Sequence, residues 1–197
     1  MKKIVVATKN KGKIREMMNA FEGLDVELVP LSVFGELPDA VEDAETFEEN
    51  ALIKARFYME KTGEACLADD SGLEVDELGG APGVYSARYS GYHADDASNN
   101  AKLLSELERV GKKESPAGYR CVLAFVDTDG TECTADGVCR GVIKPVARGE
   151  GGFGYDPYFY VEDNKTMAEL TLDEKDKISH RGEALRGMAD ILKTYLG

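Results

Sequence analysis

Cysteines are few in this sequence, and their spacing argues against the common metal and redox motifs. Cys66, Cys121, Cys133 and Cys139 form no C-x-x-C pair, and each lies in an apolar or strand-like segment. Zinc sites and redox-active dithiols use closely spaced cysteines, so we expect neither here. The sequence predicts four reduced thiols in the core or in strands, which is typical of a reducing compartment.

Long apolar runs and positive charge are also scarce. The apolar start, residues 4–7, is too short for a signal peptide, and no run is long enough to span a membrane, so we expect a cytoplasmic protein with no membrane partner. Lys and Arg number 24 against 37 Asp and Glu, which gives a formal net charge of −13. This acidity argues against a nucleic acid polymer as partner, because such a partner requires a broad basic face. A small anion carried with a divalent metal remains compatible.

No repeat, low-complexity tract or linker-like stretch divides the chain, so we predict a single domain over residues 1–197. Strand-like and helix-like segments alternate in the first half, and two strand-like runs meet at Asp129-Gly130, as in a hairpin. The alternation predicts an α/β fold with a mixed sheet, helices on its faces and two lobes. Strands are expected at 3–8, 26–29, 65–68, 119–127, 133–142 and 158–161, and helices at 12–22, 46–61, 95–110 and 182–196.

A basic cluster stands out in this acidic chain. Lys9, Lys11, Lys13 and Arg15 fall at the start of the first expected helix. The helix dipole and the unpaired first-turn N–H groups favour anions at this end, so the cluster indicates a phosphate-bearing ligand. The alternative is a solvated basic turn with Asn10 as the N-cap.

A pair of carboxylates follows the expected strand at 65–68. Asp69-Asp70-Ser71-Gly72 would then lie at the carboxyl edge of a strand, where α/β sheets usually place ligand groups. Hard oxygen ligands of this kind suit Mg²⁺. The alternative is an ordinary turn, because Asp-Ser-Gly is common turn chemistry.

A third candidate group surrounds the start of the helix expected at 46–61. Thr46 and Glu49 have the spacing of a capping box, which assigns Glu49 mostly to structure. Glu42 lies outside that box and is predicted to be free to bind a metal. Asn50 and Lys54 are four residues apart on one helical face, so Lys54 either snorkels to solvent or reaches a phosphate.

Two later segments complete the candidates. In Gly152-Phe153-Gly154-Tyr155-Asp156, an aromatic ring between glycines can stack on a base, and Asp156 can accept hydrogen bonds from ring N–H groups. In the run from Lys175 to Gly182, His180 and Arg181 add donors at the start of the last expected helix. Either residue could instead be a capping or surface residue.

Together these segments resemble the house-cleaning purine nucleoside triphosphate pyrophosphatases, which hydrolyse inosine, deoxyinosine and xanthosine triphosphates. The matching segments follow the family's order across nearly the whole chain, without a departure at a motif position. They are Thr8-x-Asn10-x-x-Lys13, Glu42 with Thr46-Phe47-x-Glu49-Asn50-Ala51-x-x-Lys54-Ala55, Ala68-Asp69-Asp70-Ser71-Gly72-Leu73, Gly79-Gly80-x-Pro82-Gly83-x-x-Ser86-Ala87-Arg88, Gly152-Phe153-Gly154-Tyr155-Asp156-Pro157 and Ser179-His180-Arg181-Gly182.

The resemblance implies an elongated mixed β-sheet flanked by helices, two lobes around a central active-site cleft, and a homodimer. It implies water attack at the α-phosphorus, with Asp70 as general base, to give a nucleoside monophosphate and pyrophosphate. The implied roles are Thr8, Asn10, Lys13, Lys54 and Ser71 for the triphosphate, Glu42 and Asp70 for Mg²⁺, Phe153 for stacking on the base within a substrate-binding loop that includes Gly154 and Tyr155, and Asp156, Lys175, His180 and Arg181 for the edge of the base.

This assignment agrees with elementary chemistry. An acidic protein needs local lysines and a metal to bind a triphosphate and to stabilise charge on leaving pyrophosphate. Donors from His180 and Arg181 suit a 6-keto oxygen, whereas adenine's 6-amino group would leave buried donors facing donors. Three alternatives compete: a hydrolase of modified pyrimidine nucleotides, a nucleotide sensor without turnover, and a purely structural domain. The base-recognition segment disfavours the first, the acidic residues disfavour the second, and the basic cluster disfavours the third.

Overall fold

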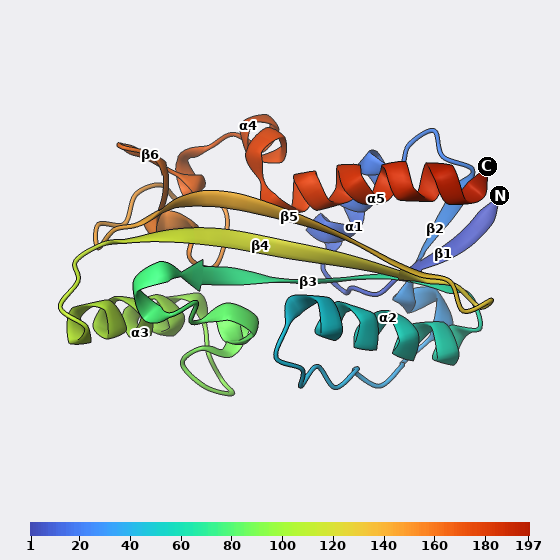
Figure 1. Ribbon diagram of the computed structural model, residues 1–197, viewed down its shortest axis with the longest axis horizontal. Helices are drawn as coiled ribbons and strands as arrows, with labels where there is room; N and C mark the ends of the chain where they lie inside the picture. The colour runs from blue at the N-terminus through green and yellow to red at the C-terminus, as the bar shows by residue number, and fades with distance from the viewer. The chain divides into compact units, whose positions relative to one another are not determined.

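The computed structural model describes residues 1–197, apart from the side chain of Leu172. The chain forms two compact units (Figure 1). Unit 1 comprises Met1–Asp70, Cys121–Gly137 and Arg181–Gly197, and unit 2 comprises Ser71–Arg120 and Val138–His180. Three long strands supply residues to both units: β3 (Ala65–Val75), β4 (Ser115–Val126) and β5 (Glu132–Ile143).

Unit 1 is built on a sheet with the strand order β2-β1-β3-β4-β5. Strand β1 (Lys2–Val6) pairs in parallel with β2 (Val26–Pro30) on one side and with β3 on the other. Helix α2 (Phe47–Thr62) covers the opposite face of this sheet from helices α1 (Lys11–Ala20) and α5 (His180–Leu196) (Figure 1). The core between the sheet and α1 and α5 includes Ile4, Val6, Met17, Phe21, Leu67, Leu123, Phe125, Leu185, Met188 and Leu192.

Side-chain caps determine where helices α1 and α2 begin. The Asn10 Oδ1 accepts hydrogen bonds from the backbone N–H groups of Gly12 and Lys13, at 2.8 and 3.2 Å, so Asn10 is the N-cap of α1. Thr46 caps α2 by accepting from the backbone N–H of Glu49. The predicted capping box is only half formed, because the Glu49 carboxylate accepts from the Thr46 hydroxyl rather than from a backbone N–H.

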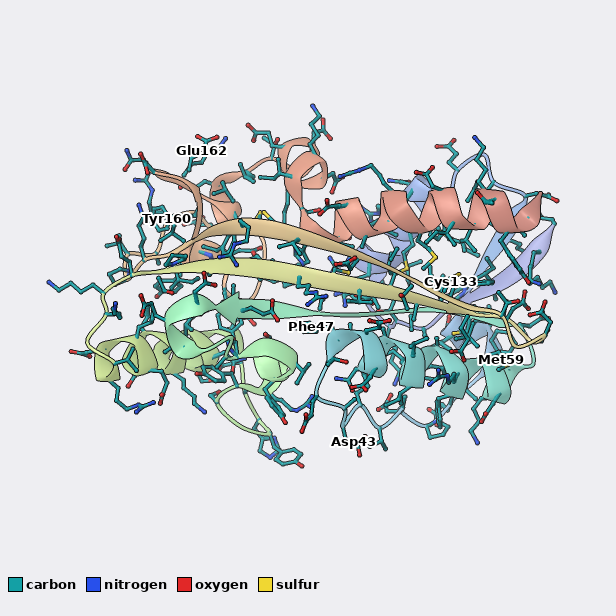
Figure 2. The ribbon with its side chains drawn as sticks, in the orientation of Figure 1. Asp43, Phe47, Met59, Cys133, Tyr160 and Glu162 are labelled. Carbon is teal, nitrogen blue, oxygen red and sulfur yellow. The ribbon has the colours of Figure 1, made fainter. Side chains whose placement is uncertain are left out.

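Unit 2 continues the sheet in the order β3-β4-β5-β6-β7, with β6 (Phe159–Glu162) antiparallel to β5 and to β7 (Lys165–Thr166). On β6, Phe159 and Tyr160 are buried, whereas Glu162 at the end of the strand is exposed (Figure 2). The unit also holds helices α3 (Asp96–Arg109) and α4 (Leu172–Ile178). Its core is formed by Leu73, Val75, Leu103, Leu107, Ala117, Tyr119, Cys139, Ile143, Tyr155, Phe159 and Met167.

Short 3₁₀ turns occur in both units. They lie at Leu31–Phe34 in unit 1 and at Asp76–Leu78, Gly83–Arg88, Asp156–Tyr158 and Met167–Glu169 in unit 2.

The predicted hairpin joins β4 to β5 at the end of unit 1. The backbone N–H of Asp127 donates to the carbonyl of Thr131 at 2.8 Å and closes the turn. The buried Asp127 carboxylate also pairs with Lys2 and accepts from the Tyr195 hydroxyl at 2.6 Å. This carboxylate therefore ties the turn to β1 and to the last turn of α5.

The α/β class and the main elements are confirmed, but one boundary that matters for the site is not. We expected a strand that ends at residue 68, with a turn at Asp69-Asp70-Ser71-Gly72 as the alternative, whereas β3 continues through this segment to Val75. Leu73 and Val75 are fully buried, and their burial favours extended backbone over a turn. Strand β7 and helix α4 were not predicted. The division into lobes around a cleft remains a prediction.

The cysteines have the environment that the sequence predicts. All four are free thiols, and Cys133 is the one that is only partly buried. Burial raises the pKa of Cys66 to about 12 and that of Cys121 to about 12, so both thiols stay protonated at neutral pH. Within the part of the chain that the structure describes, no helix is long and apolar enough to cross a membrane.

Candidate active site

Strand β3 directs its two adjacent carboxylates to opposite faces of the sheet. Successive side chains of a strand alternate, so Asp69 follows Leu67 toward the face that α1 and α5 cover. Asp70 lies on the other face, within electrostatic reach of Lys54 and Glu42. The two aspartates therefore do not form a single pair of acidic ligands, and their roles differ.

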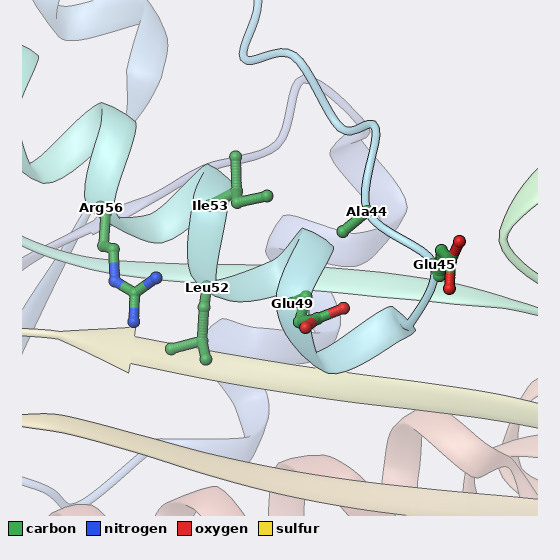
Figure 3. A pocket seen from close by; sticks show the side chains of 6 residues that line it. All are labelled: Ala44, Glu45, Glu49, Leu52, Ile53 and Arg56. Carbon is green, nitrogen blue, oxygen red and sulfur yellow. The ribbon is translucent and has the colours of Figure 1, made fainter.

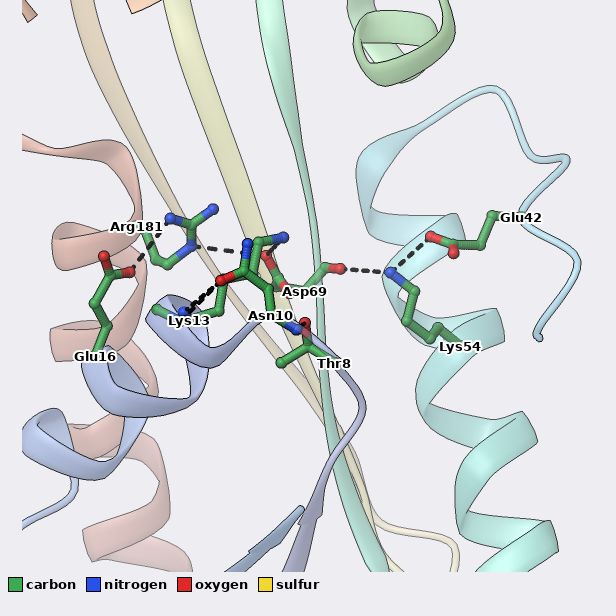
Figure 4. Close-up of polar contacts among 9 residues, drawn as sticks. Thr8, Asn10, Lys13, Glu16, Glu42, Lys54, Asp69 and Arg181 are labelled. Carbon is green, nitrogen blue, oxygen red and sulfur yellow. Dashed lines mark hydrogen bonds and ion pairs between the residues drawn. The ribbon is translucent and has the colours of Figure 1, made fainter. Parts of the chain in front are cut away.

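Asp69 is the centre of an ion-pair group in unit 1 (Figure 4). Its side chain is 1% exposed, and its Oδ2 accepts a hydrogen bond from the Lys13 Nζ at 2.7 Å. The Arg181 Nε lies 3.7 Å from the same oxygen, and Arg181 also pairs with Glu16 at 3.3 Å. Burial alone would raise the pKa of Asp69, but the charges of Lys13 and Arg181 outweigh it and hold that pKa well below its ordinary value.

This group corrects part of the reasoning on the basic cluster. Lysines at a helix N-terminus need an anion nearby, and for Lys13 the chain itself supplies one in Asp69. Lys9 pairs with Asp39 at the surface, at 2.7 Å. Asp69 therefore already compensates the positive charge of Lys13, and phosphate binding at this helix start remains a prediction.

On the other side of β3, Lys54 connects helix α2 to the strand (Figure 4). Its Nζ donates to the backbone carbonyl of Asp69 at 2.8 Å and pairs with the Glu42 carboxylate at 2.7 Å. Burial lowers the pKa of Lys54, but the neighbouring carboxylates of Asp69 and Glu42 more than offset this and keep it charged. Glu42 is thus paired with Lys54, and its role as a metal ligand remains a prediction.

Asp70 is the carboxylate with the higher pKa. Burial raises its pKa to about 6; the charge of Lys54 opposes this increase and that of Glu42 adds to it. Nearby, the buried amide of Asn50 exchanges two hydrogen bonds with the backbone of Ala44, at 2.9 and 3.3 Å. Asn50 thereby anchors the segment that carries Glu42, a structural role that the sequence did not indicate.

Three further predicted phosphate ligands lie close to these groups in the chain. Thr8 follows strand β1, and its hydroxyl oxygen accepts from the backbone N–H of Asn10 at 3.2 Å. The Asn10 side chain is occupied as the cap of α1. Ser71 follows Asp70 within β3 and is the first residue of unit 2.

Unit 2 brings together most of the residues predicted to read the base. The Phe153 side chain is 59% exposed, whereas Asp156 is buried. One Asp156 oxygen accepts from the backbone N–H of Phe153 at 3.1 Å and from the Lys175 Nζ at 2.7 Å. The same ammonium lies 5.0 Å from the centre of the Phe153 ring. The Tyr155 hydroxyl donates to the backbone carbonyl of Ser86 at 2.7 Å, so Tyr155 supports the loop from within the core.

His180 and Arg181 are neighbours in sequence but have different partners. His180 is buried and stacks on the ring of Tyr119, with centroids 5.0 Å apart. Arg181 belongs to the Asp69 group of unit 1. Sequence reasoning missed Tyr119 and Glu16. An aromatic residue inside a strand reads as core, and a surface-like glutamate on a helix carries no signal until Arg181 lies beside it.

One surface pocket in unit 1 is separate from these groups (Figure 3). It lies beside α2 and the segment that precedes it, and none of the predicted site residues is among those lining it within the described chain. Its lining residues are Ala44, Glu45, Glu49, Leu52, Ile53 and Arg56. Among the described residues, no group of three or more His, Cys, Asp or Glu side chains is arranged to hold a metal ion.

The fold and these groups define an α/β protein with buried carboxylates held by lysines and arginine. Residues 4–191 match the Ham1 family. A dITP/XTP pyrophosphatase from Geobacter sulfurreducens is 52% identical to this chain over 198 residues, covering 100% of this chain and 98% of that protein. A dITP/XTP pyrophosphatase from Bacillus anthracis is 48% identical over 201 residues, covering 100% of both. The structure of a HAM1 protein from Coxiella burnetii matches with a TM-score of 0.93 and 42% identity, covering 98% of this chain and 100% of that one. The chain belongs to the Ham1 family.

Proposed function

We propose that this protein hydrolyses inosine, deoxyinosine and xanthosine triphosphates to the nucleoside monophosphate and pyrophosphate. Membership of the Ham1 family and similarity over the whole chain to dITP/XTP pyrophosphatases support the substrate class. The observation that carries the proposal is the pairing of lysines with carboxylates around residues 69 and 70, Lys13 with Asp69 and Lys54 with Glu42. A metal triphosphate has the same two kinds of charge, so its phosphates suit the lysines and its cation suits the carboxylates.

Asp70 is the proposed general base. Its carboxylate lies in a partly buried setting where the charge of Lys54 is the largest influence opposing the effect of burial. A carboxylate there can accept a proton from a water molecule that attacks the α-phosphorus. Lys13 and Lys54 would hold the phosphate chain, with Thr8, Asn10 and Ser71 as hydrogen-bonding partners. Lysine at these positions also stabilises the negative charge that develops on the departing pyrophosphate.

We further propose that Mg²⁺ is held by Asp70 and Glu42. The donors fit the ion, because both are carboxylates and the charge of Glu42 raises the pKa of Asp70, a repulsion that a divalent cation would relieve. When bound, the ion would neutralise phosphate charge and act as a Lewis acid. Glu42 would then exchange its ion pair with Lys54 for the metal, which would leave Lys54 to the substrate. We also propose that the protein is cytoplasmic and that it forms a homodimer. Light scattering of the purified protein would test the oligomeric state.

Base recognition is proposed for Phe153, Asp156, Lys175, His180 and Arg181. The exposed Phe153 ring suits stacking on a purine, and His180 and Arg181 supply donors for a 6-keto oxygen. Glu16 and Asp69 restrict the orientation of the Arg181 guanidinium, which recognition of one oxygen requires. A 6-amino group in the same place would leave buried donors unsatisfied, at about 1 to 3 kcal/mol for each donor.

A substrate panel tests this function. The wild-type protein and the Asp70→Asn variant are incubated with ITP, XTP, ATP and CTP in Mg²⁺, and pyrophosphate and orthophosphate are measured separately. The proposal expects pyrophosphate from ITP and XTP, much less from ATP and CTP, and a loss of about a hundredfold or more in its rate of release with Asp70→Asn. Release of orthophosphate, or hydrolysis of CTP in preference to ITP, would refute it.

A further inference from the structure

The backbone of the exposed Phe153 is fully engaged in hydrogen bonds although its side chain is largely in solvent. The Phe153 N–H donates to the Asp156 carboxylate at 3.1 Å. Its carbonyl accepts from the backbone N–H of Asp156 at 3.3 Å. A loop that carries an exposed aromatic ring is ordinarily free to move, and these bonds restrict that motion.

Helix α3 completes this restraint at the next residue. The Gly154 N–H donates to the Asp96 carboxylate at 2.7 Å, and the Gly154 carbonyl accepts from the Asn100 Nδ2 at 2.8 Å. Asp96 and Asn100 are four residues apart, so they lie on one side of α3, and the Asn100 Nδ2 also donates to the Asp96 carbonyl at 2.7 Å. Both polar groups of Gly154 are thus held by one helix, at a residue whose φ of +62° favours glycine.

Fold stability does not by itself explain an amide at position 100. The Asn100 side chain is buried, and its Oδ1 meets no hydrogen-bond donor among the residues that the structure describes. A buried acceptor without a partner lowers stability, so a nonpolar side chain of similar size would suit the core of unit 2 better. The benefit of the amide lies in its Nδ2, which holds the Gly154 carbonyl.

We propose that Asp96 and Asn100 are positioning residues, which hold the Gly154 peptide so that the Phe153 ring is presented in place for stacking on the purine base. The inference rests on the proposed function, because the ring is the expected stacking partner of the base. A ring that is already ordered loses less conformational entropy when the nucleotide binds. Two further residues restrain the ring. Asp156 accepts a hydrogen bond from the Phe153 N–H, and the Lys175 ammonium lies over the ring.

The chain contains no tryptophan, so Phe153→Trp introduces a single indole that reports on this loop alone. In this background, Asn100→Leu removes the hydrogen bond to the Gly154 carbonyl. Asp96→Ala removes the hydrogen bond from the Gly154 N–H. The matched control is Asp95→Ala, since Asp95 caps the same helix by accepting from Ser98 at 2.7 Å but is not bonded to Gly154. The indole's fluorescence anisotropy is measured without nucleotide, and IMP affinity is measured by quenching of the indole.

We expect Asn100→Leu and Asp96→Ala to lower the anisotropy and to weaken IMP binding by about tenfold, which corresponds to about 1.4 kcal/mol. With the native Phe153, the same variants should raise KM for ITP more than they lower kcat. Asp95→Ala should lower Tm but leave anisotropy and IMP affinity unchanged. Two variants are used so that one that fails to fold still leaves the other to decide.

Two results would overturn the inference. One is IMP binding of equal strength in the Phe153→Trp parent and in both its Asn100→Leu and Asp96→Ala variants. The other is an equal loss in Asp95→Ala, which would show that the effect comes from helix stability. Failure of the Phe153→Trp parent to bind IMP while its indole stays ordered would instead contradict the proposed function. The anisotropy measured without nucleotide separates the two failures.

Discussion

Replacing Lys13 tests the ion-pair group around Asp69. Asp69 is 1% exposed and Lys13 is 22% exposed, so the pair is largely removed from solvent. Lys13→Met keeps most of the aliphatic stem and deletes the charge, leaving a buried carboxylate with less compensation. We therefore expect a loss of stability, whereas a lysine exposed at a helix start would contribute little.

The magnitude follows from the burial and from what remains. Breaking a buried ion pair by removing one partner costs about 3 to 5 kcal/mol. The Arg181 Nε, 3.7 Å from the same oxygen, stays in place and reduces the loss. We expect about 2 to 3 kcal/mol, which for a domain of this size lowers Tm by about 4 to 12 °C.

Thermal and urea unfolding of three variants would measure this. Asp69→Asn in the Lys13→Met background should recover at least half of the loss, because a neutral amide needs no counter-charge. Lys9→Met is the matched control. Lys9 pairs with Asp39 on the surface, with side chains 71% and 80% exposed, so its removal should leave Tm unchanged. Equal Tm values for Lys13→Met and Lys9→Met, with no recovery in the double variant, would refute the reasoning.

Three other predictions follow from the site and the fold. Asp70→Asn should lower kcat for ITP by about a hundredfold or more while largely preserving IMP affinity, and near wild-type kcat would remove Asp70 as the base. Arg181→Ala should narrow the ITP-to-ATP ratio of kcat/KM, whereas Phe153→Ala should reduce both alike; equal proportional losses with Arg181→Ala would assign it to phosphate or structure. Burial would raise the pKa of Asp127, but hydrogen bonds from Lys2, Tyr195 and the Thr128 backbone lower it overall, so stability should fall as pH drops below about 4. Asp127→Asn should flatten that decline in Tm, and an unchanged decline would contradict the pairing.

The sequence was sufficient for the fold class because the periodic segments are strong. The hairpin at Asp129-Gly130, the Asn10 cap and the helices near 46–61 and 95–110 all depend on local signals that tertiary structure did not override. Strand β3 shows where local signals fail. Asp-Asp-Ser-Gly has turn propensity, but buried Leu73 and Val75 beyond it keep the chain extended.

The candidate site was predictable by residue type but not by pairing. The family resemblance placed Lys13, Glu42 and Lys54 in one functional set, yet it could not show that Lys54 is bound to Glu42, or Lys13 to Asp69. These contacts join residues that are far apart in the chain, so no local pattern encodes them. The same limit hid Asp96 and Asn100, whose helix reads as an ordinary amphipathic surface helix until Gly154 lies against it.

The most direct test of the central claim is a product analysis with ITP as substrate. Wild-type protein is incubated with ITP and Mg²⁺ in ¹⁸O-labelled water. The products are separated, and the mass of each is measured by mass spectrometry. Attack of water at the α-phosphorus predicts IMP that carries one ¹⁸O atom and pyrophosphate that carries none. IDP with labelled orthophosphate, or unlabelled IMP with labelled pyrophosphate, would contradict the account.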